Sequence, residues 1–86
     1  MTKKIQRVQT GVRIEKRLLK VLKALAENFD MSLGDLLEGM ALHCFEGKTP
    51  FSDETLSKID MLKGVYGLDL TSEDSHKLDE GEDHDK

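Results

Sequence analysis

The chain has 86 residues, a formal net charge of −4, 37% hydrophobic and 35% charged residues, and one cysteine, Cys44. These values predict one small soluble domain without an internal disulfide, and no apolar run approaches the roughly 18 residues of a membrane span. The N-terminus lacks the apolar stretch of a signal peptide, so we expect a cytoplasmic protein with no membrane partner. A chain this short buries a modest fraction of its surface, and we expect a second subunit to complete the core.

Charge is distributed unevenly along the chain. Residues 1–29 hold eight basic and two acidic side chains, which gives +6, whereas residues 69–86 hold eight acidic and two basic ones, which gives −6. The basic end therefore carries a positive field that the total charge conceals.

The first predicted element is a short strand at residues 8–14, VQTGVRI, where apolar or small residues alternate with polar ones. Its outward face would carry Gln9, Gly11 and Arg13. A lone strand leaves its backbone groups unpaired, so we expect it to pair antiparallel with the same strand of a second copy. The alternative is a disordered or helix-extending N-terminus.

Two amphipathic helices follow, at about 15–28 and 33–46. Leu18, Leu22, Leu25 and Phe29 recur at helical spacing in the first, which should end near Asn28–Asp30. The second should begin with a Ser32 N-cap and end at Gly47; its apolar positions are Leu33, Leu36, Leu37, Met40, Ala41 and Cys44.

A third, shorter helix is predicted at about 53–64, after the Thr49-Pro50 break, with Ser52 as its N-cap and a stop at Gly64 or Gly67. From Asp69 onward large apolar residues are scarce, which predicts a disordered acidic tail. The chain therefore divides into residues 1–47 with the strand and the first two helices, residues 48–68 with a linker and the third helix, and residues 69–86 with the tail.

Residues 7–46, RVQTGVRIEKRLLKVLKALAENFDMSLGDLLEGMALHCFE, resemble a ribbon-helix-helix DNA-binding domain of the Arc/MetJ/CopG type. The resemblance rests on the order strand, helix, helix, on the spacing and on the Ser32 cap. It implies a mainly α fold with one short strand, in an intertwined homodimer whose intermolecular two-stranded antiparallel sheet enters the DNA major groove.

The resemblance also implies which residues contact double-stranded DNA. The outward strand residues Gln9, Gly11 and Arg13 would contact bases, and Gly11 could do so only through its backbone. The start of the second helix would hold a phosphate. Together with the nearby basic side chains, the expected backbone contacts are Lys3, Lys4, Arg7, Lys16, Arg17, Ser32, Leu33 and Gly34.

These expectations indicate a homodimeric, sequence-specific transcriptional repressor that is not an enzyme. No catalytic constellation or cofactor motif is present, and the adjacent His43 and Cys44 point apart on a helix, so neither a cofactor nor a metal is predicted. One alternative is an antitoxin whose residues 50–80 bind a toxin; another is a helical protein-interaction module that never touches DNA. A further hypothesis lets the acidic tail compete with DNA for the basic end.

Overall fold

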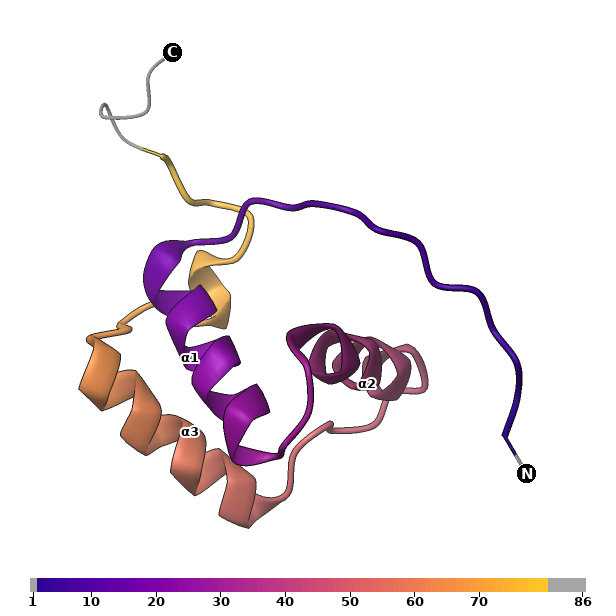
Figure 1. The fold of residues 1–86 in the computed structure, drawn as a ribbon. Coiled ribbons are helices and arrows are strands. Elements are labelled where there is room, and N and C mark those ends of the chain that lie inside the picture. Colours follow the sequence, from indigo (N-terminus) through magenta and orange to yellow (C-terminus); the bar gives the residue numbers. More distant parts are fainter. Residues whose placement is uncertain (1, 81–86) are drawn as a thin grey trace.

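The computed structural model describes residues 2–80, and within that range the chain forms three α-helices (Figure 1). They are α1 (Lys16–Asn28), α2 (Leu33–Phe45) and α3 (Asp53–Tyr66), followed by the short 3₁₀ helix η1 (Ser72–Asp74). Helix α1 lies between the other two, and both α2 and α3 pack against it. The three predicted helices are therefore confirmed.

The helix starts follow from local capping. The Ser32 hydroxyl accepts the Asp35 backbone N–H at 3.1 Å, and the Ser52 hydroxyl accepts the Thr55 N–H at 3.2 Å, so both predicted N-caps are confirmed. Glu15 caps α1, because its carboxylate accepts the Leu18 N–H at 2.8 Å. Each cap satisfies a backbone donor that the first turn of a helix leaves without an intrahelical partner.

Residues in the left-handed backbone conformation follow each of the three helices. Asp30 has φ of 57° between α1 and α2, where the first helix was expected to end, and Gly47 has φ of 72° after α2. Helix α3 passes through Gly64 and ends at Tyr66, so the predicted stop at Gly64 is wrong. Gly67, with φ of 66°, takes the left-handed conformation instead, and the Leu68 N–H bonds to the Lys63 carbonyl.

The core is small and is built around α1. Its buried side chains in the described chain are Val21, Leu22, Leu25, Ala26 and Leu36. Half-buried residues from all three helices and from the α2–α3 connection surround them: Phe29, Leu33, Leu37, Met40, Phe51, Ile59 and Leu62. The apolar stripe predicted for α1 is thus the centre of the fold.

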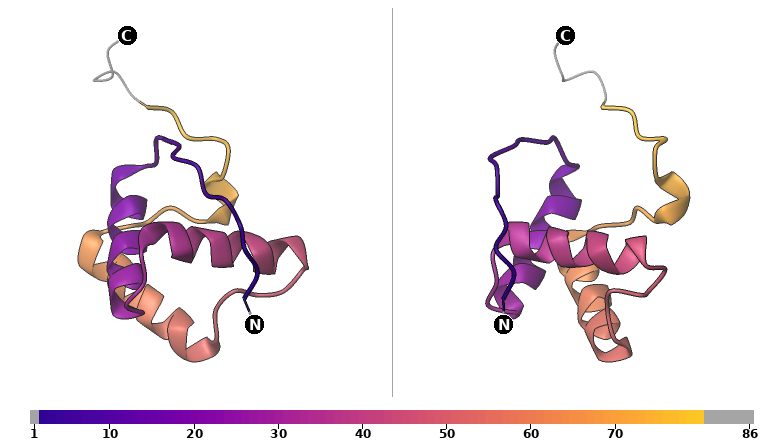
Figure 2. Two further views of the ribbon diagram at one scale, coloured as in Figure 1. Left: turned by 45° about the vertical axis from the view of Figure 1, so that its right-hand side comes forward. Right: turned by 90° about the vertical axis from the view of Figure 1, so that its right-hand side faces the viewer.

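The predicted strand at residues 8–14, and with it the ribbon-helix-helix fold and its intermolecular two-stranded sheet, is wrong. No strand occurs in residues 2–80, and residues 2–14 make no backbone–backbone hydrogen bond with any described residue. A strand requires neighbouring unpaired backbone groups, whereas α1 and α2 use theirs internally. The N-terminal segment (residues 2–14) instead leaves α1 as an extended coil and passes alongside α2 (Figure 2).

The acidic end also differs from its prediction. The part between Asp69 and Glu80 is placed beside the helices and contains η1, whose Thr71 cap and Asp74 carboxylate form a reciprocal capping box. Residues 69–80 thus contain local structure that the sequence did not predict: the capping box of η1 and ion pairs from Asp69 to Arg17 and from Glu80 to Arg13. The rest of the predicted tail, residues 81–86, lies outside the described residues.

Substantial apolar surface remains uncovered. In α2, Leu42 is 64% and Phe45 is 82% exposed, and Ala41 and Cys44 are also exposed, although the sequence placed the last two on the packed face. The Cα radius of gyration is 14.8 Å, against about 12 Å for a compact domain of this length. One copy of the chain thus leaves part of its apolar surface in water.

Candidate nucleic-acid interface

The arginines of the N-terminal segment and α1 are held by carboxylates. Arg7 makes a two-pronged ion pair with Glu38 of α2, with Nε–Oε2 and Nη2–Oε1 distances both of 2.9 Å, and its Nη2 lies 3.8 Å from Asp35. Hydrogen bonding from Arg7 lowers the pKa of Glu38 below its ordinary value. This pair ties the N-terminal segment to α2.

Arg13, predicted to contact a base, pairs with Glu80 near the end of the described chain. Both side chains are exposed, so water screens the pair and it contributes little to stability. The pair nonetheless brings a carboxylate from the acidic end onto a residue of the predicted DNA surface.

Arg17 joins three parts of the molecule. Its Nε bonds to the Glu15 carboxylate at 3.0 Å, and its Nη1 bonds to the Gly67 carbonyl at 2.9 Å and to Asp69 at 3.1 Å. The carboxylate of Glu15 raises the pKa of Arg17. Arg17 therefore fixes the chain that leaves α3 against the start of α1, a structural role that the sequence did not indicate.

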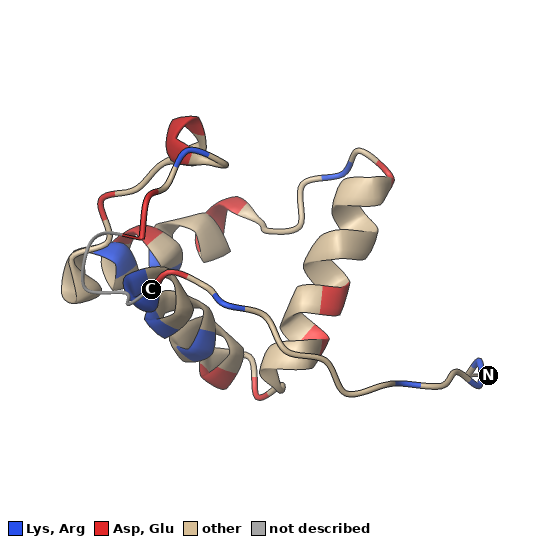
Figure 3. Cartoon of the chain, turned by 90° about the horizontal axis from the view of Figure 1, so that it is seen from above, with Lys and Arg blue, Asp and Glu red and all other residues tan. Residues whose placement is uncertain are grey.

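The lysines behave differently from the arginines. Lys16, Lys20 and Lys23 are spaced by four and three residues and form one exposed face of α1, here called the lysine face (Figure 3). Together with Lys3 and Lys4 they form no ion pair with any residue in the described range, and Lys20 lies 6.0 Å from the centre of the Tyr66 ring. Their charge is open to solvent and to an anionic partner.

Only some of the residues predicted to contact DNA surround one open hollow. A hollow of about 540 Å³ between the N-terminal segment and the helices is lined by Gln9 and Gly11, by Leu33 and Gly34 at the start of α2, and by Lys23. It brings two predicted base contacts together with two predicted backbone contacts. Ser32 caps the same helix start.

The other predicted contacts lie elsewhere. Arg13 and Lys16 line a second hollow with Glu80, Arg7 lies on Glu38, and Lys3 and Lys4 are exposed near the N-terminal end. Arg17 is occupied by Glu15 and Asp69. The structure thus separates the predicted set into an open group and a group paired with acids.

Sequence reasoning left Lys20 and Lys23 out of the predicted site. The sequence does indicate them, because both follow Lys16 at the spacing of one helix face. Glu38 and Glu80 were also missed, and no local pattern marks them, because they meet Arg7 and Arg13 across 31 and 67 residues of chain.

Two further findings concern other kinds of site. Among residues 2–80 no group of three or more His, Cys, Asp or Glu side chains is arranged to hold a metal ion. Nor does any helix in that range have the length and apolar character needed to cross a bilayer.

Comparison of the chain with protein-family models, with curated proteins and with solved structures finds no match.

Proposed function

We propose that this protein binds double-stranded DNA as a homodimer and acts as a transcriptional repressor. The observation that carries the proposal is the set of exposed lysines without carboxylate partners in the described chain: Lys3, Lys4, Lys16, Lys20 and Lys23. A lysine that is not neutralised within the protein can bind a DNA phosphate and release the counterions condensed on the DNA. This release is the main source of sequence-independent DNA affinity.

DNA binding in this form does not need paired strands. An extended basic segment and a basic helix face can both follow a phosphate backbone, and Gln9, which is exposed, has an amide suited to adenine. Arg13 can reach guanine after leaving Glu80, and an exposed ion pair of this kind opposes the exchange only weakly. Base selection is then assigned to Gln9 and Arg13.

The dimer part of the proposal rests on α2. Its C-terminal part exposes four apolar residues, of which Ala41 and Cys44 extend the packed side of the helix, whereas Leu42 and Phe45 lie on its other sides. A chain with a core of this size is only marginally stable and gains from further apolar burial. A second copy that covers this end supplies the missing burial. It also doubles the number of lysines presented to one DNA duplex.

The proposal is tested by measuring affinity for a mixed-sequence DNA duplex by fluorescence anisotropy over a range of salt concentrations. Changing Lys16, Lys20 and Lys23 together to glutamine should weaken binding and reduce the slope of log K against log salt by about 0.9 for each phosphate that the variant no longer neutralises. The matched control changes Lys48, Lys58 and Lys77 to glutamine, which alters the net charge equally. Equal weakening by both triple variants, or binding that is insensitive to salt, contradicts the proposal.

A protein partner bound through residues 50–80 is the second candidate, because Met61 and Val65 are exposed one turn apart on α3. An antitoxin would use such a surface to bind its toxin. Changing both residues to lysine should abolish capture of a toxin encoded beside this gene while DNA binding is retained. Retained capture by that variant contradicts this second candidate.

A further inference from the structure

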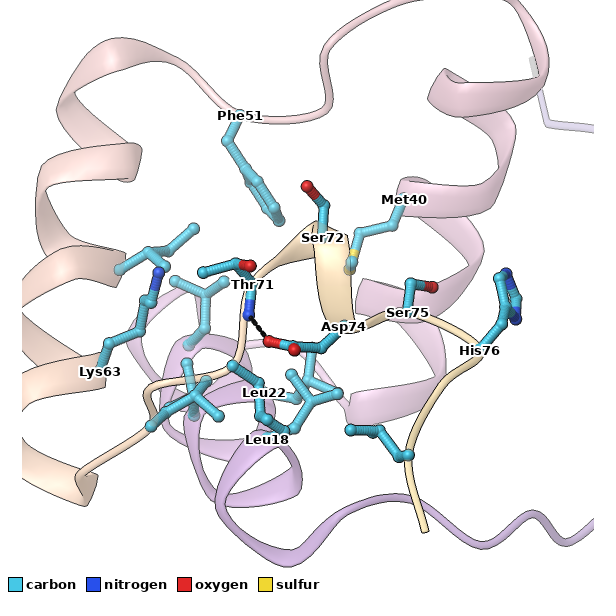
Figure 4. Close-up of a pocket in the computed structure, with 16 residues that line it drawn as sticks. Leu18, Leu22, Met40, Phe51, Lys63, Thr71, Ser72, Asp74, Ser75 and His76 are labelled. Atoms are coloured by element: carbon cyan, nitrogen blue, oxygen red, sulfur yellow. Dashed lines mark hydrogen bonds between the residues drawn. The ribbon is translucent and has the colours of Figure 1, made fainter.

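An apolar cavity of about 460 Å³ lies between α1, α3 and the chain that follows α3 (Figure 4). Its walls include Leu22 and Leu25 of the core, Ile59 of α3 and Phe51 of the α2–α3 connection. Its volume is within the roughly 300–1,000 Å³ of small-molecule sites, and its apolar walls offer few partners for ordered water. The cavity therefore favours an apolar occupant.

Residues 68–78, here called the strap, form one wall of this cavity. Leu68, Leu70 and Leu78 of the strap line it, as do the hydroxyl-bearing Thr71 and Ser72 of the η1 turn. Arg17 holds the chain at the start of the strap through Gly67 and Asp69. The strap thus adds polar groups to one side of an otherwise apolar cavity.

Lys63 supplies the charge at the edge of the cavity. It is half-buried on α3, extends toward Thr71 in Figure 4, and forms no ion pair with any residue between 2 and 80. The acidic side chain of the lining, Asp74, already accepts the Thr71 N–H at 2.8 Å. A half-buried cation without a counterion is stabilised by an anion.

We propose that this cavity binds a medium-chain carboxylate, with the alkyl chain among Leu22, Leu25, Phe51 and Ile59 and the carboxylate on Lys63. Thr71 also lines the cavity, and its hydroxyl, whose oxygen accepts the Glu73 N–H, still has a proton to donate to a carboxylate oxygen. Asp74 disfavours a dianionic head. This inference is independent of DNA binding.

The test titrates decanoate, decanol and decyltrimethylammonium into the full chain by isothermal titration calorimetry, below the concentrations at which each aggregates. Decanoate should bind most tightly. Lys63→Met should weaken decanoate about fivefold and leave decanol unchanged, because the variant removes only the cation that pairs with the carboxylate. The control Lys58→Met removes another half-buried lysine of α3, outside the cavity, and should change neither.

A variant that fills the cavity with a large side chain tests the location of the binding site. Ser72 is exposed on the strap, so Ser72→Trp should keep the thermal unfolding of the wild type while abolishing binding of decanoate and decanol. Three results overturn the proposal: decyltrimethylammonium binding as tightly as decanoate, Lys63→Met and Lys58→Met weakening decanoate equally, or Ser72→Trp leaving both affinities intact.

Discussion

Glu15 shows how one side chain sets the start of a helix and links it to a distant segment. Its carboxylate accepts the Leu18 N–H at 2.8 Å and also pairs with Arg17, which in turn bonds to Gly67 and Asp69. The bond from the Leu18 backbone is the main reason why the pKa of Glu15 is lowered from its ordinary value of 4.5, and Arg17 lowers it further.

Replacing Glu15 with alanine should reduce the free energy of unfolding at neutral pH by about 1 kcal/mol, the usual cost of removing an N-cap. Urea denaturation measures this change. Glu27→Ala, an exposed acid on the same helix that caps nothing, is the control and should have a much smaller effect.

The effect should also depend on pH. Because the pKa of Glu15 is lower in the folded state, its contribution is fully present above the unfolded pKa and is lost as pH falls through the folded pKa. The difference between wild type and Glu15→Ala should therefore shrink as the pH drops below about 4.5. A difference that stays constant down to pH 2 contradicts this assignment.

At the scale of elements, α2 differs most from what its sequence pattern predicted. Leu36 is buried, whereas Ala41 and Cys44, which follow Leu37 at spacings of four and seven, are exposed together with Leu42 and Phe45. The reason is that α1 crosses only the first part of α2, and α3 packs on α1 and not on α2. Hydrophobic periodicity identifies an apolar face but not the element that covers it.

If a second copy covers the exposed end of α2, changing Leu42 and Phe45 together to glutamate should raise the dimer dissociation constant at least about tenfold, as expected when buried apolar anchors are removed. Sedimentation equilibrium measures this constant. The matched control places glutamates at Met61 and Val65, the exposed pair on α3. A monomeric wild type, or equal effects of the two double variants, would refute this interface.

At the scale of the whole molecule, α3 and the α2–α3 connection complete the core that α1 and α2 form. Phe51, Ile59 and Leu62 pack against the cluster around Leu22 and Leu25, although the sequence assigned them to a segment outside the DNA-binding domain. Ending the chain after Lys48 would therefore expose the centre of the fold to water.

The truncated chain, residues 1–48, should show no cooperative thermal unfolding, because the missing burial costs at least about 3 kcal/mol in a domain with little stability to spare. Circular dichroism measures the transition. Deleting residues 2–12 is the control and should preserve it, since the described core has no buried residue in that range. A cooperative transition in the 1–48 chain would show that α3 is dispensable.

The sequence by itself determined the helices and the separation of charge. The caps at Ser32 and Ser52 and the left-handed turns at Asp30 and Gly47 are bonds and conformations that span a few residues, so their signals are local. The strand prediction at residues 8–14 failed because alternation shows only that a segment could pair; a ladder also needs a neighbouring backbone with free donors and acceptors.

Only the tertiary structure decided which cations remain open and where the chain leaves a cavity. Arg7 and Arg13 are paired because Glu38 and Glu80 come near them in space, whereas Lys16 and Lys23 form no ion pair with an acid of the described chain. The cavity beside Lys63 is bounded by residues of α1 and α3, by Met40 of α2 and by the strap, which come together only in the folded chain. Such features depend on contacts between residues far apart in the sequence, and local residue patterns do not predict those contacts.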